Sequence, residues 1–269
     1  MAWSPGMSWH FWLRATLLVI GAVATSLFIH GSDNIQGYLH GVDRLTADRK
    51  AAQHEPKLLV NGEVKLREAV VMTAALLVVT LGIAVYFVLT STWIAIIFGT
   101  FVFVLTVQYS VGVKMSYRGL GEVAVLLSGL GTPLAVGLLQ GRLDGSALTV
   151  GVMLGLFFVA VNVNSNYADH PFDLAAGRRT LAVRIGLEGQ RRLAVGVACA
   201  AWSTFLVAIL VRALPVYALA GLILVHRHVR QLDALFLGDA LTARRLGFGT
   251  FRRMSGIVTV AFLLEHGLV

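Results

Sequence analysis

Long apolar stretches separated by short polar segments dominate the chain, and this alternation predicts its fold class. A stretch of about 20 apolar residues crosses a bilayer as a helix, which satisfies its own backbone hydrogen bonds there. A strand pattern of alternating apolar and polar residues is missing from the sequence. We therefore expect an all-α polytopic membrane bundle of about eight transmembrane helices. They are expected at residues 11–32, 66–88, 92–112, 119–140, 147–166, 193–212, 213–227 and 253–268.

Composition supports this interpretation and excludes an ordinary soluble protein. Hydrophobic residues make up 57% of the 269 residues and charged residues 13%, with a mean hydropathy of +0.78. We expect a single membrane-embedded domain over residues 1–269. The first helix is too long for a removable signal peptide, and no small-residue cleavage site follows it. Cys199 lies inside an apolar run, so it predicts packing rather than a disulfide framework.

The positive charge follows the expected membrane topology. A formal net charge of +8 could indicate nucleic acid, but 19 of the 22 lysines and arginines lie in four alternate loops. These loops are residues 43–67, 114–118, 178–192 and 227–253. Loops rich in Lys and Arg remain on the cytoplasmic side of the membrane. The pattern predicts a multi-pass protein of the cell membrane, with no nucleic-acid partner and both termini outside.

The last basic segment has a helical pattern of its own. Residues 226–253 carry apolar side chains at near-helical spacing with arginines between them. Such a pattern is typical of an amphipathic helix that lies on an anionic membrane surface. We therefore expect one interfacial helix over 226–253, and no catalytic role for Asp233 or Asp239.

The most informative polar stretch is 162–186, at the end of an apolar run. Asp169 and Asp173 are four residues apart and would share one face of a helix. This arrangement suits Mg²⁺, which binds a few carboxylates and leaves its other positions to water and phosphate. Arg178 and Arg179 follow, and guanidinium groups match phosphate oxygens. A solvated loop between two membrane helices is the alternative. Three alternating asparagines precede the acids: Asn162, Asn164 and Asn166.

A second acidic segment, residues 30–64, opens on the same predicted side of the membrane. Lys57 follows Pro56 in this segment and would either bind an anionic head group or contribute a topology charge. Between two later helices, Tyr117 and Arg118 stand before a helix N-terminus, where anions bind readily. They predict a phosphate contact or a membrane-anchoring pair. The oxygen ligands of the 30–64 segment are Asp33, Asn34, Asp43 and Asp48.

These motifs together resemble the UbiA superfamily of intramembrane prenyltransferases. Residues 162–186, ending in GRRTLAVRIG, resemble its second aspartate motif, and KLLVNGEV resembles the element that follows its first motif. YRGLGE is similar to a stretch of the menaquinone-type branch, whose acceptor is a dihydroxynaphthoate. The likeness covers about residues 14 to 186 in the correct order.

The sequence departs from the family pattern in two respects. The first motif of the family reads roughly Asn-Asp-x-x-Asp, followed in the menaquinone-type branch by Gly-x-Asp. Here the aligned residues are 33–37, Asp-Asn-Ile-Gln-Gly, followed by Gly41, Val42 and Asp43. Gly37 therefore stands where relatives have a carboxylate, which should weaken or reposition one metal ion. The family also has nine helices with the N-terminus inside, whereas this pattern predicts eight, without the first.

The resemblance implies an Mg²⁺-dependent enzyme that transfers an isoprenoid chain from a prenyl diphosphate to an aromatic, quinone-precursor-like acceptor. The alternatives are a terpene cyclase of the same superfamily and a non-catalytic lipid-binding member; a transporter lacks support because the acids lie at helix ends. The implied metal ligands are Asp169 and Asp173 for one Mg²⁺, with Asp33, Asn34 and Asp43 as the remainder of a second site. Asn166 is implied in catalysis beside these residues. The implied diphosphate ligands are Lys57, Tyr117, Arg118, Asn162, Arg178 and Arg179.

Overall fold

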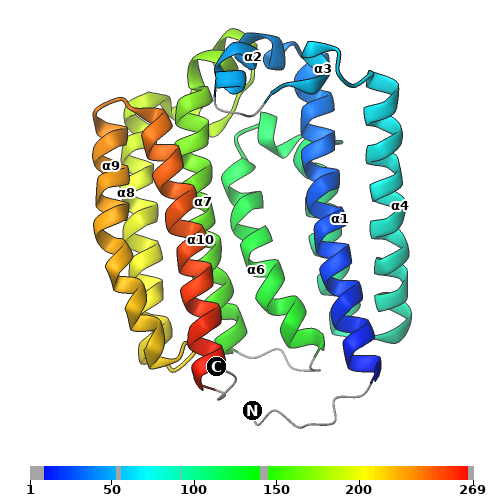
Figure 1. The fold of residues 1–269 in the computed structure, drawn as a ribbon, viewed down its shortest axis with the longest axis vertical. Coiled ribbons are helices and arrows are strands. Elements are labelled where there is room, and N and C mark those ends of the chain that lie inside the picture. The colour runs from blue at the N-terminus through cyan, green and yellow to red at the C-terminus, as the bar shows by residue number, and fades with distance from the viewer. Residues whose placement is uncertain (1–8, 53–55, 92, 140–144, 266–269) are drawn as a thin grey trace. The chain divides into compact units, whose positions relative to one another are not determined.

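The computed structural model describes residues 9–52, 56–91, 93–139 and 145–265, and within them every regular element is a helix. The predicted all-α class is confirmed (Figure 1). The elements are α1 (Trp9–Leu39), α2 (Val42–Ala52), α3 (Leu58–Asn61), α4 (Leu66–Thr90), α5 (Trp93–Ser110), η1 (Met115–Tyr117), α6 (Gly121–Leu139), α7 (Gly145–Ala175), α8 (Leu181–Leu210), η2 (Val216–Ile223), α9 (Leu224–Phe236) and α10 (Ala240–Glu265).

The first six predicted spans each coincide with an observed helix. Among the described residues, α1, α4, α7 and α8 are long and apolar enough to cross a membrane. Only 11% of the apolar window of α1 and 6% of that of α4 is buried inside the protein. Exposed apolar surface of that extent is expected where a helix faces lipid, because lipid takes the place of a protein core.

The structure of residues 213–253 differs from the predicted short span followed by one surface helix. The 213–227 span is a 3₁₀ segment, η2, that continues into α9. The prediction of one interfacial helix over 226–253 is wrong, because α9 ends at Phe236 and α10 begins at Ala240. Gly238 has a φ of 82° in the connection, and the Thr242 amide donates to Asp239 Oδ1 over 3.0 Å. A glycine followed by an aspartate is a stop and start signal for helices, and it separates the two.

The chain folds as two compact units, each built from segments distant in sequence. Unit 1 contains Glu122–His170 and Leu181–Val269, and unit 2 contains Ser8–Gly121 and Pro171–Thr180. The last turn of α7 and the segment after it therefore pack with the N-terminal helices. The end of the second acidic motif, residues 171–180, therefore lies in the same unit as the first acidic motif.

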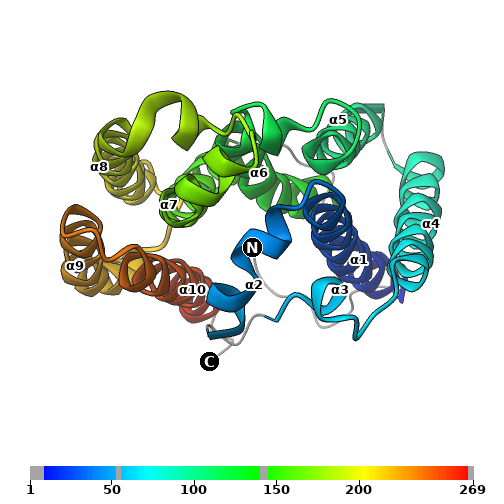
Figure 2. The ribbon, with the colours of Figure 1, turned by 90° about the horizontal axis from the view of Figure 1, so that it is seen from above.

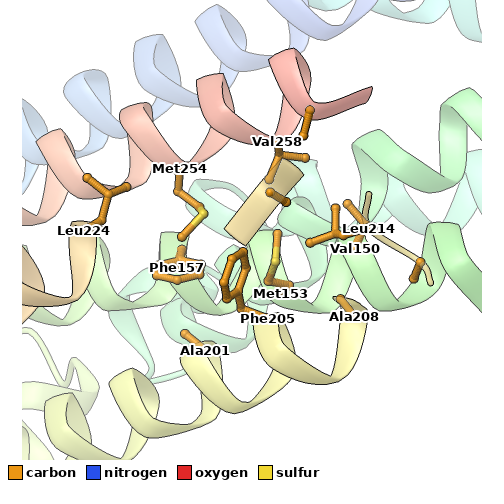
Figure 3. Close-up of a cluster of buried hydrophobic side chains, with 13 residues drawn as sticks. Val150, Met153, Phe157, Ala201, Phe205, Ala208, Leu214, Leu224, Met254 and Val258 are labelled. Atoms are coloured by element: carbon orange, nitrogen blue, oxygen red, sulfur yellow. The ribbon is translucent and has the colours of Figure 1, made fainter. Parts of the chain in front are cut away.

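Unit 1 has a continuous apolar core between α7, α8, η2 and α10 (Figure 3). Phe157 and Phe205 are almost completely buried in it, together with Met153 and Met254. The Phe157 ring packs edge-on against Trp202 with centroids 5.2 Å apart. Figures 1 and 2 both show α10 beside α9, and Figure 2 shows α9 beside α8. In unit 2, α1 packs against α4 and α5 and carries α2 and α3 near its C-terminal end.

Helices α6 and α7 of unit 1 approach each other through facing glycines. A Cβ atom built on Gly155 would lie 2.7 Å from the Leu126 carbonyl oxygen, and one on Gly129 would lie 2.7 Å from the Gly155 amide nitrogen. Backbone atoms cannot yield locally, so a side chain here must separate the helices. We expect Gly155→Ala to lower the free energy of unfolding by about 1–3 kcal/mol.

The measurement for Gly155→Ala is thermal unfolding of the purified protein in detergent. Gly196→Ala is the matched control, because a Cβ at Gly196 on α8 meets nothing within 4 Å. Alanine favours a helix over glycine by about 1 kcal/mol, so the control should be neutral or slightly stabilising. Equal behaviour of the two variants would contradict the close approach of α6 and α7.

Candidate functional site

The first acidic segment is folded back on itself at the junction of α1 and α2. Gly41 has a φ of 76°, which ends α1 and places Asp43 in the first turn of α2. The Asp43 carboxylate returns to α1 and lies against Gly37. A Cβ built on Gly37 would lie 2.7 Å from Asp43 Oδ1 and 2.9 Å from its Cγ. The glycine that departs from the family motif therefore makes room for the carboxylate of Asp43.

Lys57 connects the two helices at this point. Its Nζ lies 2.7 Å from Asp43 Oδ1 and donates to Asn34 Oδ1 over 3.2 Å. The Asp43 side chain is only 8% exposed and that of Lys57 19%. Burial raises the pKa of Asp43 above its ordinary value, while the hydrogen bond and the charge of Lys57 act in the opposite direction. Lys57 is thus a largely buried cation held among oxygen atoms of the first motif.

The second acidic motif forms a matching pair. Asp173 is 1% exposed near the end of α7, and Arg178 Nη1 lies 3.1 Å from its Oδ1. Gly177 has a φ of 69°, and the Arg178 amide donates to the Asp173 carbonyl oxygen over 2.9 Å. A left-handed glycine after a helix reverses the chain in this way. The turn brings the guanidinium of Arg178 back onto the carboxylate five residues earlier.

Tyr117 lies against the second pair. The Arg178 guanidinium stacks over its ring at 3.9 Å, and the Arg179 amide donates to its carbonyl oxygen over 3.2 Å. The ring of His40, at the end of α1, lies 5.3 Å away on centroids. The Tyr117 hydroxyl is buried and has no hydrogen-bond partner among the described residues. Its proton is therefore available to a ligand oxygen.

Electrostatics connect the two pairs within unit 2. Burial raises the pKa of Tyr117 to about 12, with Arg178 opposing the rise and Asp33, Asp43 and Asp173 adding to it. All four charges therefore act on one phenol, which stays protonated throughout the physiological range. Unit 2 thus contains carboxylates on α1, α2 and α7, cations at Lys57 and Arg178, and the phenol of Tyr117 on η1.

A separate polar group lies in unit 1. Asn166 Nδ2 donates to Glu122 Oε1 over 2.7 Å and to Asn162 Oδ1 over 2.8 Å. Glu122 is buried, and its Oε2 has no hydrogen-bond partner among the described residues. Asn164 is fully buried and lies instead beside Gly247 of α10. The three alternating asparagines therefore do not act together.

The structure brings together some of the predicted site residues and not others. The Arg118 side chain is exposed and, in the described part of the chain, makes no hydrogen bond or ion pair. Asp169 is partly buried, one turn before Asp173 on α7. The predicted set misses Glu122 and His40; an acid at the start of an apolar helix was the available signal for Glu122. The residues gathered in unit 2 are Asp33, Asn34, Asp43, Lys57, Tyr117, Asp173 and Arg178, and those of unit 1 are Asn162, Asn166 and Asp169.

The donor set of unit 2 fits a hard cation only in part. No three His, Cys, Asp or Glu side chains in the described residues stand together as a metal ligand set. The carboxylate oxygens of Asp33, Asp43 and Asp173 are nevertheless the ligands that Mg²⁺ prefers, and Mg²⁺ commonly takes one or two carboxylates plus substrate phosphates. The chemistry of these residues therefore fits Mg²⁺ bound together with a phosphate-bearing substrate.

Comparison with known proteins identifies the family of the chain. The model of the UbiA prenyltransferase family matches residues 1–240, and the chain belongs to that family. The chain is therefore a multi-pass membrane protein of the prenyltransferase class. The superfamily resemblance is confirmed; the menaquinone-type branch and the cytoplasmic placement of the acidic motifs remain predictions.

A solved structure has the same fold. The chain is similar to the apo structure of a UbiA homolog from Aeropyrum pernix K1, with a TM-score of 0.72 and 19% sequence identity. The likeness covers 93% of this chain and 90% of that one. No curated protein matches the sequence. At this identity the likeness establishes the fold alone.

Proposed function

We propose that this protein is an Mg²⁺-dependent prenyltransferase that transfers an isoprenoid chain from a prenyl diphosphate to an aromatic, quinone-precursor-like acceptor. The observation that carries the proposal is the gathering in unit 2 of two largely buried cations, Lys57 and Arg178, each paired with a carboxylate. Arg178 stacks on the ring of Tyr117, whose hydroxyl has no hydrogen-bond partner among the described residues. Such donors are what a diphosphate requires.

The ion pairs preorganise the donors for this substrate. Lys57 Nζ and the Arg178 guanidinium are held by Asp43 and Asp173 and can turn their hydrogen bonds to diphosphate oxygens. The carboxylates of Asp43 and Asp173 would then be available to hold the divalent cation that accompanies the diphosphate. By family resemblance, Asp169 and Asp173, one turn apart on α7, would hold one Mg²⁺, with Asp33, Asn34 and Asp43 available to another. Mg²⁺ supplies Lewis-acid stabilisation of the leaving diphosphate.

The reaction breaks the allylic C–O bond, and the electron pair leaves with the diphosphate oxygen. Lys57, Arg178 and the Tyr117 hydroxyl stabilise the charge that develops on that oxygen. A ring carbon of the aromatic acceptor forms the new C–C bond with the allylic carbon, and the proton on that ring carbon passes to water or to the released diphosphate. Apolar helices exclude water from the prenyl cation, which would otherwise be hydrolysed. We place the acidic motifs on the cytoplasmic side, where the basic loops are predicted to lie.

The test uses the purified chain in nanodiscs with Mg²⁺ and prenyl diphosphates of several lengths. Diphosphate release is followed with and without aromatic acceptors, and products are identified by mass. An acceptor-dependent prenylated product supports the proposal. A cyclised product formed without acceptor would establish a terpene cyclase instead. No release with any substrate would favour a non-catalytic lipid-binding protein.

Lys57→Met should lower kcat/KM for the prenyl diphosphate by about 10- to 100-fold, because a charge-assisted hydrogen bond to the leaving group is lost. The variant also leaves Asp43 without its partner, so its thermal transition must be measured beside the kinetics. Lys65→Met is the matched control, since Lys65 is exposed at the start of α4. An unchanged kcat/KM in a folded Lys57→Met protein would exclude Lys57 from diphosphate binding.

A further inference from the structure

A cluster of four arginines lies on the α9–α10 helix pair of unit 1. Arg227 and Arg230 come from α9, and Arg252 and Arg253 come from α10. Arg227 is half-buried and the other three are exposed. Arg227 and Arg230, three positions apart, are neighbours on one helix face, and Arg252 and Arg253 are adjacent on α10.

Two arginines of the cluster meet at Gly249, where α10 has no side chain. The Arg227 guanidinium lies against this residue: a Cβ built there would come within 2.9 Å of Arg227 Cζ and 3.0 Å of its Nε. Arg253 Nη1 donates to the Gly249 carbonyl oxygen over 3.4 Å. Arg227 Nε is buried and has no hydrogen-bond partner among the described residues. Guanidinium groups from two helices are thus held at one place.

No carboxylate neutralises these charges in the part of the chain that the structure describes. Asp239 Oδ1 accepts from the Thr242 amide instead. Arginines elsewhere do have acids, as Arg192 has Glu188 at 3.2 Å. Four like charges at close quarters repel one another, and an anion from outside the chain relieves that repulsion. The cluster is therefore complementary to a negatively charged ligand.

The surroundings of the cluster identify the kind of anion. On the α9 side, the apolar segment η2 ends immediately before it, and Ile223 is 78% exposed. On the α10 side, apolar residues follow Arg253, and Val260 is also exposed. In a membrane protein, exposed apolar side chains at this level contact acyl chains. Arginines at the end of such a surface reach the head-group region, where the lipid phosphates lie.

We propose that the Arg227–Arg230–Arg252–Arg253 cluster is a binding site for the phosphate of an anionic phospholipid, with the acyl chains along η2 and the second half of α10. The site is independent of the proposed diphosphate chemistry. The family match ends at residue 240, so that Arg252 and Arg253 lie outside it.

Native mass spectrometry of the delipidated protein in detergent tests the proposal by titration with phosphatidylglycerol or phosphatidylcholine. Arg252→Gln/Arg253→Gln should weaken phosphatidylglycerol binding by at least about tenfold, since each arginine near anionic lipid contributes appreciably. Arg67→Gln/Arg192→Gln removes the same charge from exposed positions elsewhere and should bind as the unmodified protein does. Phosphatidylcholine should bind weakly to all of them.

A second variant keeps every charge. Gly249→Val obstructs the place occupied by the Arg227 guanidinium and should weaken phosphatidylglycerol binding in the same direction, with the thermal transition confirming the fold. Three results would overturn the proposal. The first is an equal loss of phosphatidylglycerol affinity in the cluster and control variants, and the second is equal affinity of the protein for the two lipids. The third is displacement of phosphatidylglycerol by inorganic phosphate at a comparable concentration, which would indicate a site for a soluble anion.

Discussion

Asp173→Asn is expected to lower the rate of Mg²⁺-dependent diphosphate release by about 10²–10³-fold, because it removes the charge that pairs with Arg178 and that would hold Mg²⁺ in the proposed site. Asp173 is 1% exposed, and its Oδ1 lies 3.1 Å from Arg178 Nη1. Asparagine keeps the volume and can still accept from Arg178, so the fold should survive with a lower thermal transition. The measurement is diphosphate release from a prenyl diphosphate in nanodiscs.

The control for Asp173→Asn is the same substitution of Asn for Asp at a position outside the proposed site. Asp233 is exposed on α9, and Asp233→Asn should leave diphosphate release unchanged. Removal of Mg²⁺ by a chelator should depress the unmodified protein and Asp233→Asn equally, and should have little further effect on Asp173→Asn. If a folded Asp173→Asn protein released diphosphate at the normal rate, the second motif would not be the site of the reaction.

Gly37→Asp, which restores the carboxylate of the family motif, is expected to reduce both stability and diphosphate release. A Cβ at Gly37 would lie 2.7 Å from Asp43 Oδ1, so a side chain there must expel the Asp43 carboxylate from its pair with Lys57. It also sets two negative charges side by side. We expect a loss of about 3–5 kcal/mol, as when one partner of a buried ion pair is displaced. Thermal unfolding and diphosphate release measure the two effects.

The double variant Gly37→Asp/Asp43→Gly should recover part of both properties, because it returns one carboxylate to the space that Asp43 occupies. Gly82→Ala is the matched helix control; it lies on α4, where a Cβ meets nothing within 4 Å. That control should be neutral or slightly stabilising. If Gly37→Asp were tolerated as well as Gly82→Ala, the glycine at position 37 would not be needed to accommodate the Asp43 carboxylate.

The predicted spans and the observed helices agree best where the apolar runs are long. The runs at 66–88 and 147–166 lie within α4 and α7. A membrane allows few alternatives to a helix for such a run, so length alone decides the element. The prediction fails at 226–253, where amphipathic spacing continues on both sides of Gly238 and conceals the turn between α9 and α10. The Gly-Asp pair marks the turn locally, but spacing does not.

For the candidate site too, the sequence predicted some features and not others. The spacing of Asp169 and Asp173 and the arginines after them was sufficient to predict a phosphate-directed motif and the family. Sequence order also predicted that Asp43 belongs with the first motif. It did not predict that Lys57 binds Asp43, that Arg178 stacks on Tyr117 from 61 positions away, or that Arg118 remains apart.

Local composition, run length and residue order were enough to predict the helical class, the positions of the long apolar helices and the family. Three features became visible only in the folded protein: the pairing of each cation with its carboxylate, the space at Gly37 that Asp43 occupies, and the approach of Arg227 and Arg253 to Gly249. The physical reason is that these contacts join residues distant in the chain. Whether two side chains meet depends on how closely helices approach and where a glycine turns the backbone, and packing of the whole unit sets both.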